Sequence, residues 1–247
     1  MVTAAPQDQW RLLDVQAHDT RLTQLTHRRR TLAEHAEVER LNERMRQIGD
    51  QLVAVRTVAS DVARELTKAE ADVEQVRQRA VRNRSRLDSG QGSAKDLQAI
   101  QHELESLAQR QSVLEDAQLE VMERLETAQA RVSEVEAEQE RLSGELAEAG
   151  ARRDRLVAEL DDEAAAEQRA RADSAAGLPG QLLELYEKVR EQAGGVGAAR
   201  LSQHRCEGCR LELNTTDLTR IRAAAQDAVV RCEECRRILV RTPESGL

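Results

Sequence analysis

Four cysteines near the C-terminal end of the chain form two identically spaced pairs. The pairs read Cys206-Glu-Gly-Cys209 and Cys232-Glu-Glu-Cys235, with 22 residues between them. Two residues between thiolates let a tight turn direct both sulfurs at one ion, and two such turns complete a tetrahedral site. The all-sulfur ligand set favours zinc, with iron in a rubredoxin-like centre as the weaker alternative. Because four protein ligands leave no open position, we expect a structural Zn²⁺ that folds this segment and does not activate water.

Other interpretations of the cysteines fit the sequence less well. They could be core thiols or two redox dithiols, but a redox pair usually accompanies a βαβ pattern that this sequence lacks. His204 could replace a ligand, yet four cysteines suffice, so we expect its ring in solvent or behind the ligands. The many Asp and Glu residues follow helical spacing on exposed faces, where no pocket desolvates them. The sequence therefore predicts no catalytic residue, no small-molecule substrate and no enzyme activity.

The composition limits the elements that can hold this centre. Aromatic residues make up 1% of the 247 residues (Trp10, Tyr186 and no Phe), charged residues make up 33%, and there are 12 Gly and 3 Pro. This composition is typical of long helices and excludes a β-sandwich, a barrel or a doubly wound sheet. No apolar run approaches the length that a bilayer requires, and the N-terminus lacks a signal-like segment. We therefore expect a cytoplasmic protein without membrane contact, where clustered cysteines favour metal over disulfides.

A heptad pattern dominates the first part of the chain. From Val38 to Ala80 the apolar positions alternate in steps of three and four, which predicts a coiled-coil seam. Apolar positions between Leu12 and Leu32 are also helical in spacing but follow a different register. We expect a stutter between Leu32 and Val38 through which the helix continues.

A second seam of nearly equal length follows a short break. The pattern stops at 87–93, which contains two Gly and two Ser, and resumes from Leu97 to Leu160, with Ser93 or Asp96 expected to cap the new helix. The first arm has 16 basic and 13 acidic residues over 11–88, and the second has 10 and 21 over 95–173. Net charges of +3 and −11 favour pairing of the two arms as an antiparallel hairpin. One continuous rod that pairs with a second molecule fits the break less well.

The predicted fold class is mainly α, with a long antiparallel coiled-coil hairpin and a small C-terminal zinc ribbon. The hairpin is expected at 1–176 with its turn near 88–94, a linker with a short helix at 177–193, and the ribbon at 194–247. Antiparallel pairing should bring position 76 near 107, position 52 near 132 and position 41 near 142. Within the ribbon we expect strands at 198–201 and 229–231, and a helix at 215–225 capped by Thr215 or Thr216.

Three segments carry a resemblance to a known family: the start of the second arm at 97–105, the Leu-Leu-Glu-Leu-Tyr helix at 182–186, and the second cysteine pair within 229–239. The chain resembles bacterial coiled-coil proteins with a C-terminal four-cysteine zinc ribbon, often described as nucleic-acid-binding zinc ribbon proteins. The resemblance implies a hairpin plus a ribbon with the four cysteines as zinc ligands. In one respect the chain departs from the family, because Glu233 and Arg236 stand where Pro and Gly are common. A non-Gly residue at a positive-φ knuckle position costs stability.

The charge distribution bears on two expected functions, docking of a protein partner and binding of nucleic acid. The net charge of −8 opposes general nucleic-acid binding. Residues 194–247 carry a net charge of +2, which the formal −2 charge of a zinc tetrathiolate cancels. This segment also has no aromatic residue on which a base could stack. A basic cluster near the turn is either a partner or nucleic-acid contact or a salt-bridged surface; it comprises Arg77, Arg79, Arg82, Arg84, Arg86 and Lys95.

We therefore predict a non-enzymatic adaptor or scaffold that docks a protein partner, with transcription or RNA-handling machinery as a setting by fold analogy. The alternative is a nucleic-acid-binding protein that uses the ribbon and the basic turn.

Overall fold

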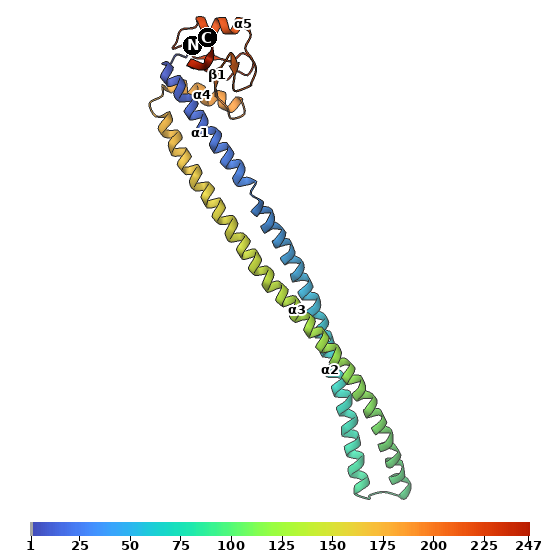
Figure 1. Cartoon of the computed structure of the whole chain (residues 1–247). Coiled ribbons are helices and arrows are strands. Elements are labelled where there is room, and N and C mark those ends of the chain that lie inside the picture. Colours follow the sequence, from blue (N-terminus) through green and yellow to red (C-terminus); the bar gives the residue numbers. More distant parts are fainter. Residues whose placement is uncertain (1) are drawn as a thin grey trace. The chain divides into compact units, whose positions relative to one another are not determined.

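The computed structural model describes residues 2–247, and these form two compact units. One unit, here called the hairpin unit, is Ala36–Gly150; the other, the ribbon unit, comprises the residues up to His35 together with Ala151–Leu247. The helices are α1 (Pro6–Arg30), α2 (Ala33–Asp88), α3 (Ala94–Ala175), α4 (Gly180–Gln192) and α5 (Thr215–Ala223) (Figure 1).

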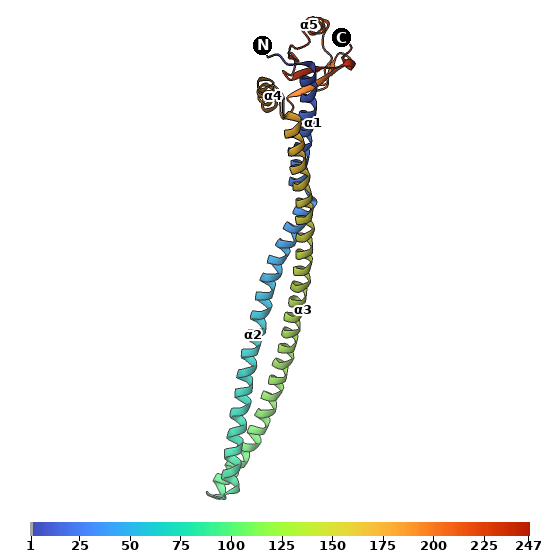
Figure 2. The same cartoon turned by 90° about the vertical axis from the view of Figure 1, so that its left-hand side faces the viewer.

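In the hairpin unit α2 and α3 run antiparallel and side by side (Figures 1 and 2). The buried side chains follow the predicted seam, and one cluster joins Leu41, Ile48 and Leu52 of α2 with Val135, Leu142 and Ala149 of α3. The expected pairs 52 with 132 and 41 with 142 fall within this cluster and its packed rim, and positions 76 and 107 are buried as well. The predicted hairpin is confirmed.

The turn between the two helices contains the predicted glycines and cap. Gly90 and Gly92 adopt φ angles of +61° and +136°, a region that favours residues without a Cβ. The Ser93 hydroxyl accepts a hydrogen bond from the Asp96 backbone N–H at 3.2 Å, and the Asp96 carboxylate accepts one from the Ser93 N–H at 3.0 Å. This reciprocal capping fixes the start of α3 and confirms the predicted cap.

The expectation of a continuous helix across residues 32–38 is wrong. Helix α1 ends at Arg30 and α2 begins at Ala33. Thr31 closes α1, because its φ of −107° and ψ of 19° lie outside the helical region, while its backbone N–H still donates to the His27 carbonyl at 3.0 Å. The change of register is therefore taken up by a break and not by a stutter.

The ribbon unit contains a four-stranded sheet in the order β2-β1-β4-β3. Its strands are β1 (Ala198–Ser202), β2 (Arg205–Cys206), β3 (Val230–Arg231) and β4 (Ile238–Arg241), with β1 and β4 parallel and the other pairs antiparallel. Strands β1 and β3 match the predicted strands, whereas β2, β4 and the 3₁₀ turn Pro243–Ser245 were not predicted.

The predicted cap of the ribbon helix is wrong by one or two residues. The side chain of Asn214 caps α5 by accepting from the Asp217 N–H at 2.8 Å, ahead of the expected Thr215 or Thr216. Asn is a stronger N-cap than Thr, which explains the choice. The helix also ends at Ala223, two residues earlier than predicted.

Helices α1 and α4 pack on this sheet around a buried polar network. Arg171 of α3 donates to Asp19 at 2.7 Å, and the Tyr186 hydroxyl donates to the same carboxylate at 2.6 Å. The Gln16 side-chain carbonyl accepts from the Gly197 N–H at 2.7 Å, directly before β1. Burial works to raise the pKa of Asp19, but the hydrogen bonds from Arg171 and Tyr186 outweigh it and hold that pKa below its usual value. The network therefore ties α1, α3 and α4 to the sheet that carries the cysteines.

Across residues 2–247, none of the helices combines the length and the apolar character needed to cross a bilayer.

Candidate metal centre

The two cysteine pairs lie on equivalent turns. Cys206 ends β2 and Cys232 follows β3 directly. Each first cysteine accepts, through its backbone carbonyl, a hydrogen bond from the N–H four residues on, at 2.7 Å from Arg210 and 2.9 Å from Arg236. Both arginines adopt positive φ, at +64° and +61°. The strained position that the sequence indicated at Arg236 therefore recurs in the first turn.

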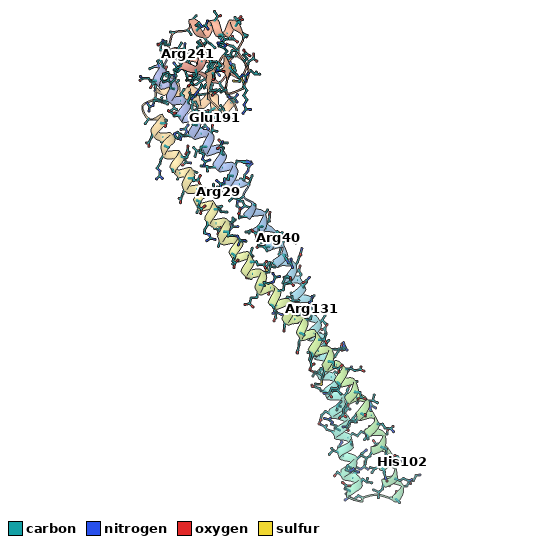
Figure 3. The ribbon with its side chains drawn as sticks, in the orientation of Figure 1. Arg29, Arg40, His102, Arg131, Glu191 and Arg241 are labelled. Carbon is teal, nitrogen blue, oxygen red and sulfur yellow. The ribbon has the colours of Figure 1, made fainter. Side chains whose placement is uncertain are left out.

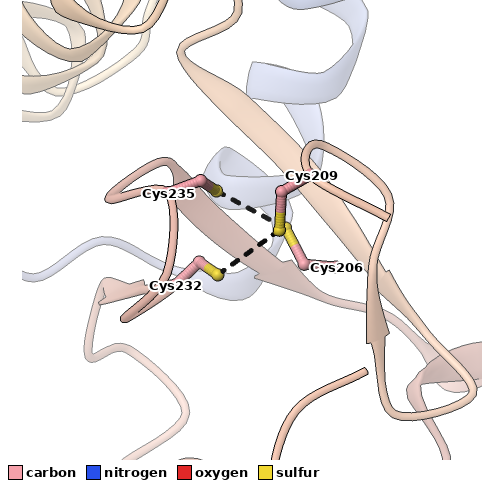
Figure 4. A group of neighbouring side chains, drawn as sticks. All are labelled: Cys206, Cys209, Cys232 and Cys235. Atoms are coloured by element: carbon pink, nitrogen blue, oxygen red, sulfur yellow. Dashed lines mark hydrogen bonds between the residues drawn. The ribbon is translucent and has the colours of Figure 1, made fainter. Parts of the chain in front are cut away.

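The four cysteine side chains point toward a common centre (Figure 4). All four Sγ atoms lie within 4.8 Å of one another. The Cys206–Cys235 and Cys209–Cys232 sulfurs are each 3.9 Å apart. Tetrahedral zinc with Zn–S bonds of about 2.3 Å places its sulfurs roughly 3.8 Å apart, so the cysteines fit a zinc ion with little movement. The structure thus brings all four predicted ligands together, and their number leaves no position for water.

Burial differs between the members of each pair. Cys206 and Cys232 are fully buried, while Cys209 and Cys235 are half-buried. Burial raises the pKa of the Cys206 and Cys232 thiols in the absence of metal. Burial acts in the same direction on Cys235, but hydrogen bonds from the Arg237 backbone, the Cys232 thiol and the Arg237 side chain outweigh it and lower the pKa of that thiol. A bound cation stabilises the thiolates, so metal binding and folding of this segment are coupled.

Arg237 and Gly208 hold the two turns together. The Arg237 guanidinium donates to the carbonyls of Gly208 at 3.1 Å, Val196 at 3.1 Å and Ala193 at 2.8 Å. A Cβ at Gly208 would lie 2.8 Å from the Arg237 side chain and 2.9 Å from Ala199. Glycine is therefore required at this position for close packing of the first turn against the second.

His204 lies outside the centre, as expected. Its Nε2 is 2.6 Å from the Gly246 carbonyl oxygen, so the ring contacts the C-terminal segment. It is not among the side chains that gather around the sulfurs.

The basic cluster near the turn divides into paired and unpaired cations. Arg77 forms an ion pair with Glu115, and Arg79 forms one with Glu103, both across the hairpin. The remaining members are exposed and make no ion pair within 4.0 Å with the described part of the chain, although the charge of Arg86 helps to lower the pKa of Asp96; they are Arg82, Arg84, Arg86 and Lys95. The salt-bridged interpretation therefore holds for two of the six residues.

Residues 194–247 contain no aromatic side chain, but Trp10 of α1 contacts this segment and supplies one. The indole N–H donates to the Arg241 carbonyl at 2.7 Å, and 43% of the side chain stays exposed. Arg241, labelled in Figure 3, ends β4. No spacing signal in the sequence links two residues 231 positions apart, so sequence reasoning missed this contact.

Two family profiles match the chain. A CT398-like coiled-coil hairpin domain matches residues 15–194, and a C4-type zinc ribbon domain matches residues 205–239. The second match contains the four cysteines, which agrees with a structural zinc site.

Mycobacterial proteins are similar over nearly the whole length. Protein Rv2229c of Mycobacterium tuberculosis is 39% identical over 93% of this chain and 94% of its own. A solved Mycobacterium smegmatis structure superposes with a TM-score of 0.86 at 38% identity, over 98% of this chain and 100% of that one. CT398 of Chlamydia trachomatis shares the fold, with a TM-score of 0.65 at 13% identity over 96% and 98% of the two chains. The chain belongs to the family of CT398-like coiled-coil hairpin proteins that carry a C4-type zinc ribbon.

Proposed function

We propose that this chain is a non-enzymatic adaptor whose hairpin unit docks a protein partner and whose ribbon unit is folded by zinc. The observation that carries the proposal is a shallow groove of about 610 Å³ on the hairpin unit. Its lining combines the apolar side chains of Val58, Val62 and Ala128 with Thr127 and four charged side chains; these are Glu120, Glu123, Arg124 and Arg131. An apolar floor with a polar rim is the usual anatomy of a protein interface.

The charges of the rim favour protein over nucleic acid. The groove presents both signs, and its arginines are engaged, since Arg124 pairs with Glu65 at 2.9 Å and Arg131 with Glu134 at 2.7 Å. A site for a phosphate backbone needs an excess of accessible cations. Val58 is 56% exposed although it lines the groove, which leaves apolar area for a partner to cover.

The metal centre supports a non-enzymatic role. In residues 2–247 the four cysteines are the one group of His, Cys, Asp and Glu side chains gathered closely enough to hold a metal ion. Four thiolates saturate a tetrahedral ion, so the ion stabilises the fold and offers no position to a substrate.

Site-specific photo-cross-linking tests the docking proposal. We would replace Val58 with p-benzoylphenylalanine and irradiate the full zinc-loaded chain in nuclease-treated lysate of its own cells. The matched control is Val53, another exposed valine of α2 that lies outside the groove. We expect a discrete cross-linked protein from position 58 and none from position 53. Equal yields from both positions, or cross-links only to nucleic acid, would contradict the proposal.

The unpaired cations at the turn favour one second candidate. Arg82, Arg84, Arg86 and Lys95 present four positive charges without ion-pair partners in the described residues. Nucleic-acid binding by this surface is the alternative function, and its signature is a steep dependence of affinity on salt.

A further inference from the structure

A cleft of about 420 Å³ lies on the ribbon unit, away from the cysteines. The N-terminal end of α1 forms one wall with Pro6, Gln9 and Trp10, and the segment around the end of α5 forms the other with Ile221 and Arg222. Strand β4 contributes Arg241 at the base, and Leu247 completes the rim. The cleft therefore combines apolar walls with two cations.

Trp10 is held in place before any ligand arrives. Its N–H is satisfied by the Arg241 carbonyl, while 43% of the side chain remains accessible. Gln9 beside it is nearly fully buried and donates to the Ala4 and Gln226 carbonyls, at 2.8 and 3.2 Å, which fixes this wall. A fixed, half-exposed indole loses little conformational entropy on binding, and tryptophan is the residue type most enriched in interface hot spots.

The charged side chains that line the cleft, Arg222 and Arg241, are both cations. The Arg241 guanidinium donates to backbone carbonyls alone, at 2.7 to 3.3 Å; they belong to Ile221, Ala224, Ala225, Gln226 and Ala228. Burial lowers its pKa, and the charge of Asp227 acts in the opposite direction. Arg222 is exposed and forms no ion pair with any described residue. No acidic side chain lines the cleft, although the whole chain carries a net charge of −8.

We propose that this cleft binds a short peptide segment of a partner protein in which a large apolar side chain lies next to Asp or Glu. The apolar side chain covers Trp10 and Ile221, and the carboxylate pairs with Arg222. This inference rests on the adaptor function and adds a second docking surface, of stated chemistry, to the groove of the hairpin unit.

A nucleic acid fits the same cleft less well. Binding of a single strand requires a row of cations along the backbone and several rings on which successive bases stack. The cleft offers one ring and one cation with free donors, because the donors of Arg241 are occupied by carbonyls. One ring and one free cation match a peptide with one apolar anchor side chain and one carboxylate.

Selection from a displayed random-peptide library on the full zinc-loaded chain tests the proposal. We expect enriched peptides to share an aromatic or large aliphatic residue adjacent to Asp or Glu. Trp10 is the single tryptophan of the chain, so tryptophan-free members of the enriched set should shift its emission saturably. An unlabelled oligonucleotide, dT12, serves as the nucleic-acid probe in the same titration.

Four variants distinguish the cleft from the rest of the ribbon. Arg222→Glu and Trp10→Ala should each weaken the selected peptides at least tenfold, measured by anisotropy of labelled peptide. The controls Arg205→Glu and Leu211→Ala change an exposed cation and an exposed apolar side chain of the same ribbon outside the cleft, and should alter affinity less than twofold. Arg222 is exposed, so its variant tests the proposal even if Trp10→Ala fails to fold.

Four results would overturn the inference: no enrichment, enrichment of peptides without acidic residues, affinity insensitive to Arg222→Glu, or a Trp10 emission shift with dT12 but not with peptides. The failure of the cleft is distinguishable from the failure of the adaptor function. If cross-linking from position 58 succeeds but peptide selection fails, the adaptor function is supported and the cleft proposal is rejected.

Discussion

The hairpin unit and the ribbon unit are stabilised in different ways. The hairpin unit buries a repeated apolar seam along α2 and α3, and its cross-helix ion pairs are exposed. The ribbon unit joins segments from both ends of the chain through a few groups that occur once each: four cysteines, Asp19 with its two hydrogen-bonding neighbours, and Arg237. We therefore expect a substitution to destabilise the hairpin unit locally, and loss of one of these single groups to destabilise the ribbon unit as a whole.

The largest expected effect comes from removing the metal. Apparent binding free energies of structural zinc are about 10–16 kcal/mol, and this energy is folding energy for a small ribbon. We expect one zinc per chain, and we expect chelation or Cys232→Ser to abolish protection of the amides between residues 197 and 241. The amides of α2 should keep their protection in hydrogen exchange. Simultaneous loss of protection in both units would remove the distinction between them.

The next largest effect is expected at Asp19. Asp19→Asn breaks a buried charge pair with Arg171 and should lower the free energy of unfolding of the ribbon unit by about 3–5 kcal/mol. Asp14→Asn, an exposed change on the same helix, is the control and should have little effect. Chemical denaturation followed by Tyr186 and Trp10 emission measures both.

The same carboxylate predicts a dependence on pH. Its pKa in the folded state is lowered from 3.8, so its contribution is fully present above pH 3.8 and is lost as the pH falls below that value. The Asp19→Asn variant should lack this component of acid unfolding. An unchanged acid transition in the variant would show that another group is responsible.

A seam substitution should act more locally. Leu142 is 1% exposed, and Leu142→Ala should lower the unfolding free energy of the hairpin unit by about 3 kcal/mol while leaving zinc content unchanged. Leu119, which is 56% exposed on the same helix, provides the control, and Leu119→Ala should cost less than about 0.5 kcal/mol. Equal destabilisation by the two changes would mean that the seam is not the core of this unit.

The smallest effect is expected for the ion pairs across the hairpin. Arg56 pairs with Glu136 at 2.6 Å, and Arg44 pairs with Glu138 at 2.9 Å, with all four side chains at least 35% exposed. Arg56→Gln should cost less than about 1 kcal/mol, because exposed pairs gain little over solvated charges. The difference from wild type in thermal melts should shrink further in 1 M salt. A cost as large as that of Leu142→Ala would reverse the ranking.

Features that repeat locally could be predicted from the sequence. The seam from Val38 onward, the Gly90–Gly92 turn and the four cysteine ligands each depend on spacing within one segment, and the structure reproduces them. The register change near Thr31 also shows in the sequence, but spacing alone does not distinguish a stutter from a break; the break lies where the Thr31 backbone leaves the helical region, with φ −107° and ψ 19°.

Features that depend on distant segments could not be predicted. The contact between Trp10 and Arg241 and the bond from Tyr186 to Asp19 join residues more than 160 positions apart, and neither is encoded by a local pattern. Strand β4 could not be predicted for a similar reason: it is short, and it forms by pairing with β1 on one side and β3 on the other. These long-range contacts are also what form the cleft of the ribbon unit.

Binding of nucleic acid at physiological salt tests the central claim, docking of protein rather than nucleic acid, most directly. Anisotropy of labelled single-stranded RNA and duplex DNA, titrated with the zinc-loaded chain over a range of salt, should show no submicromolar binding. Joint replacement of Arg82, Arg84 and Arg86 by Gln should leave that result unchanged. Submicromolar binding whose salt slope flattens by about two to three units in the triple variant would contradict the claim and establish the basic turn as a nucleic-acid site.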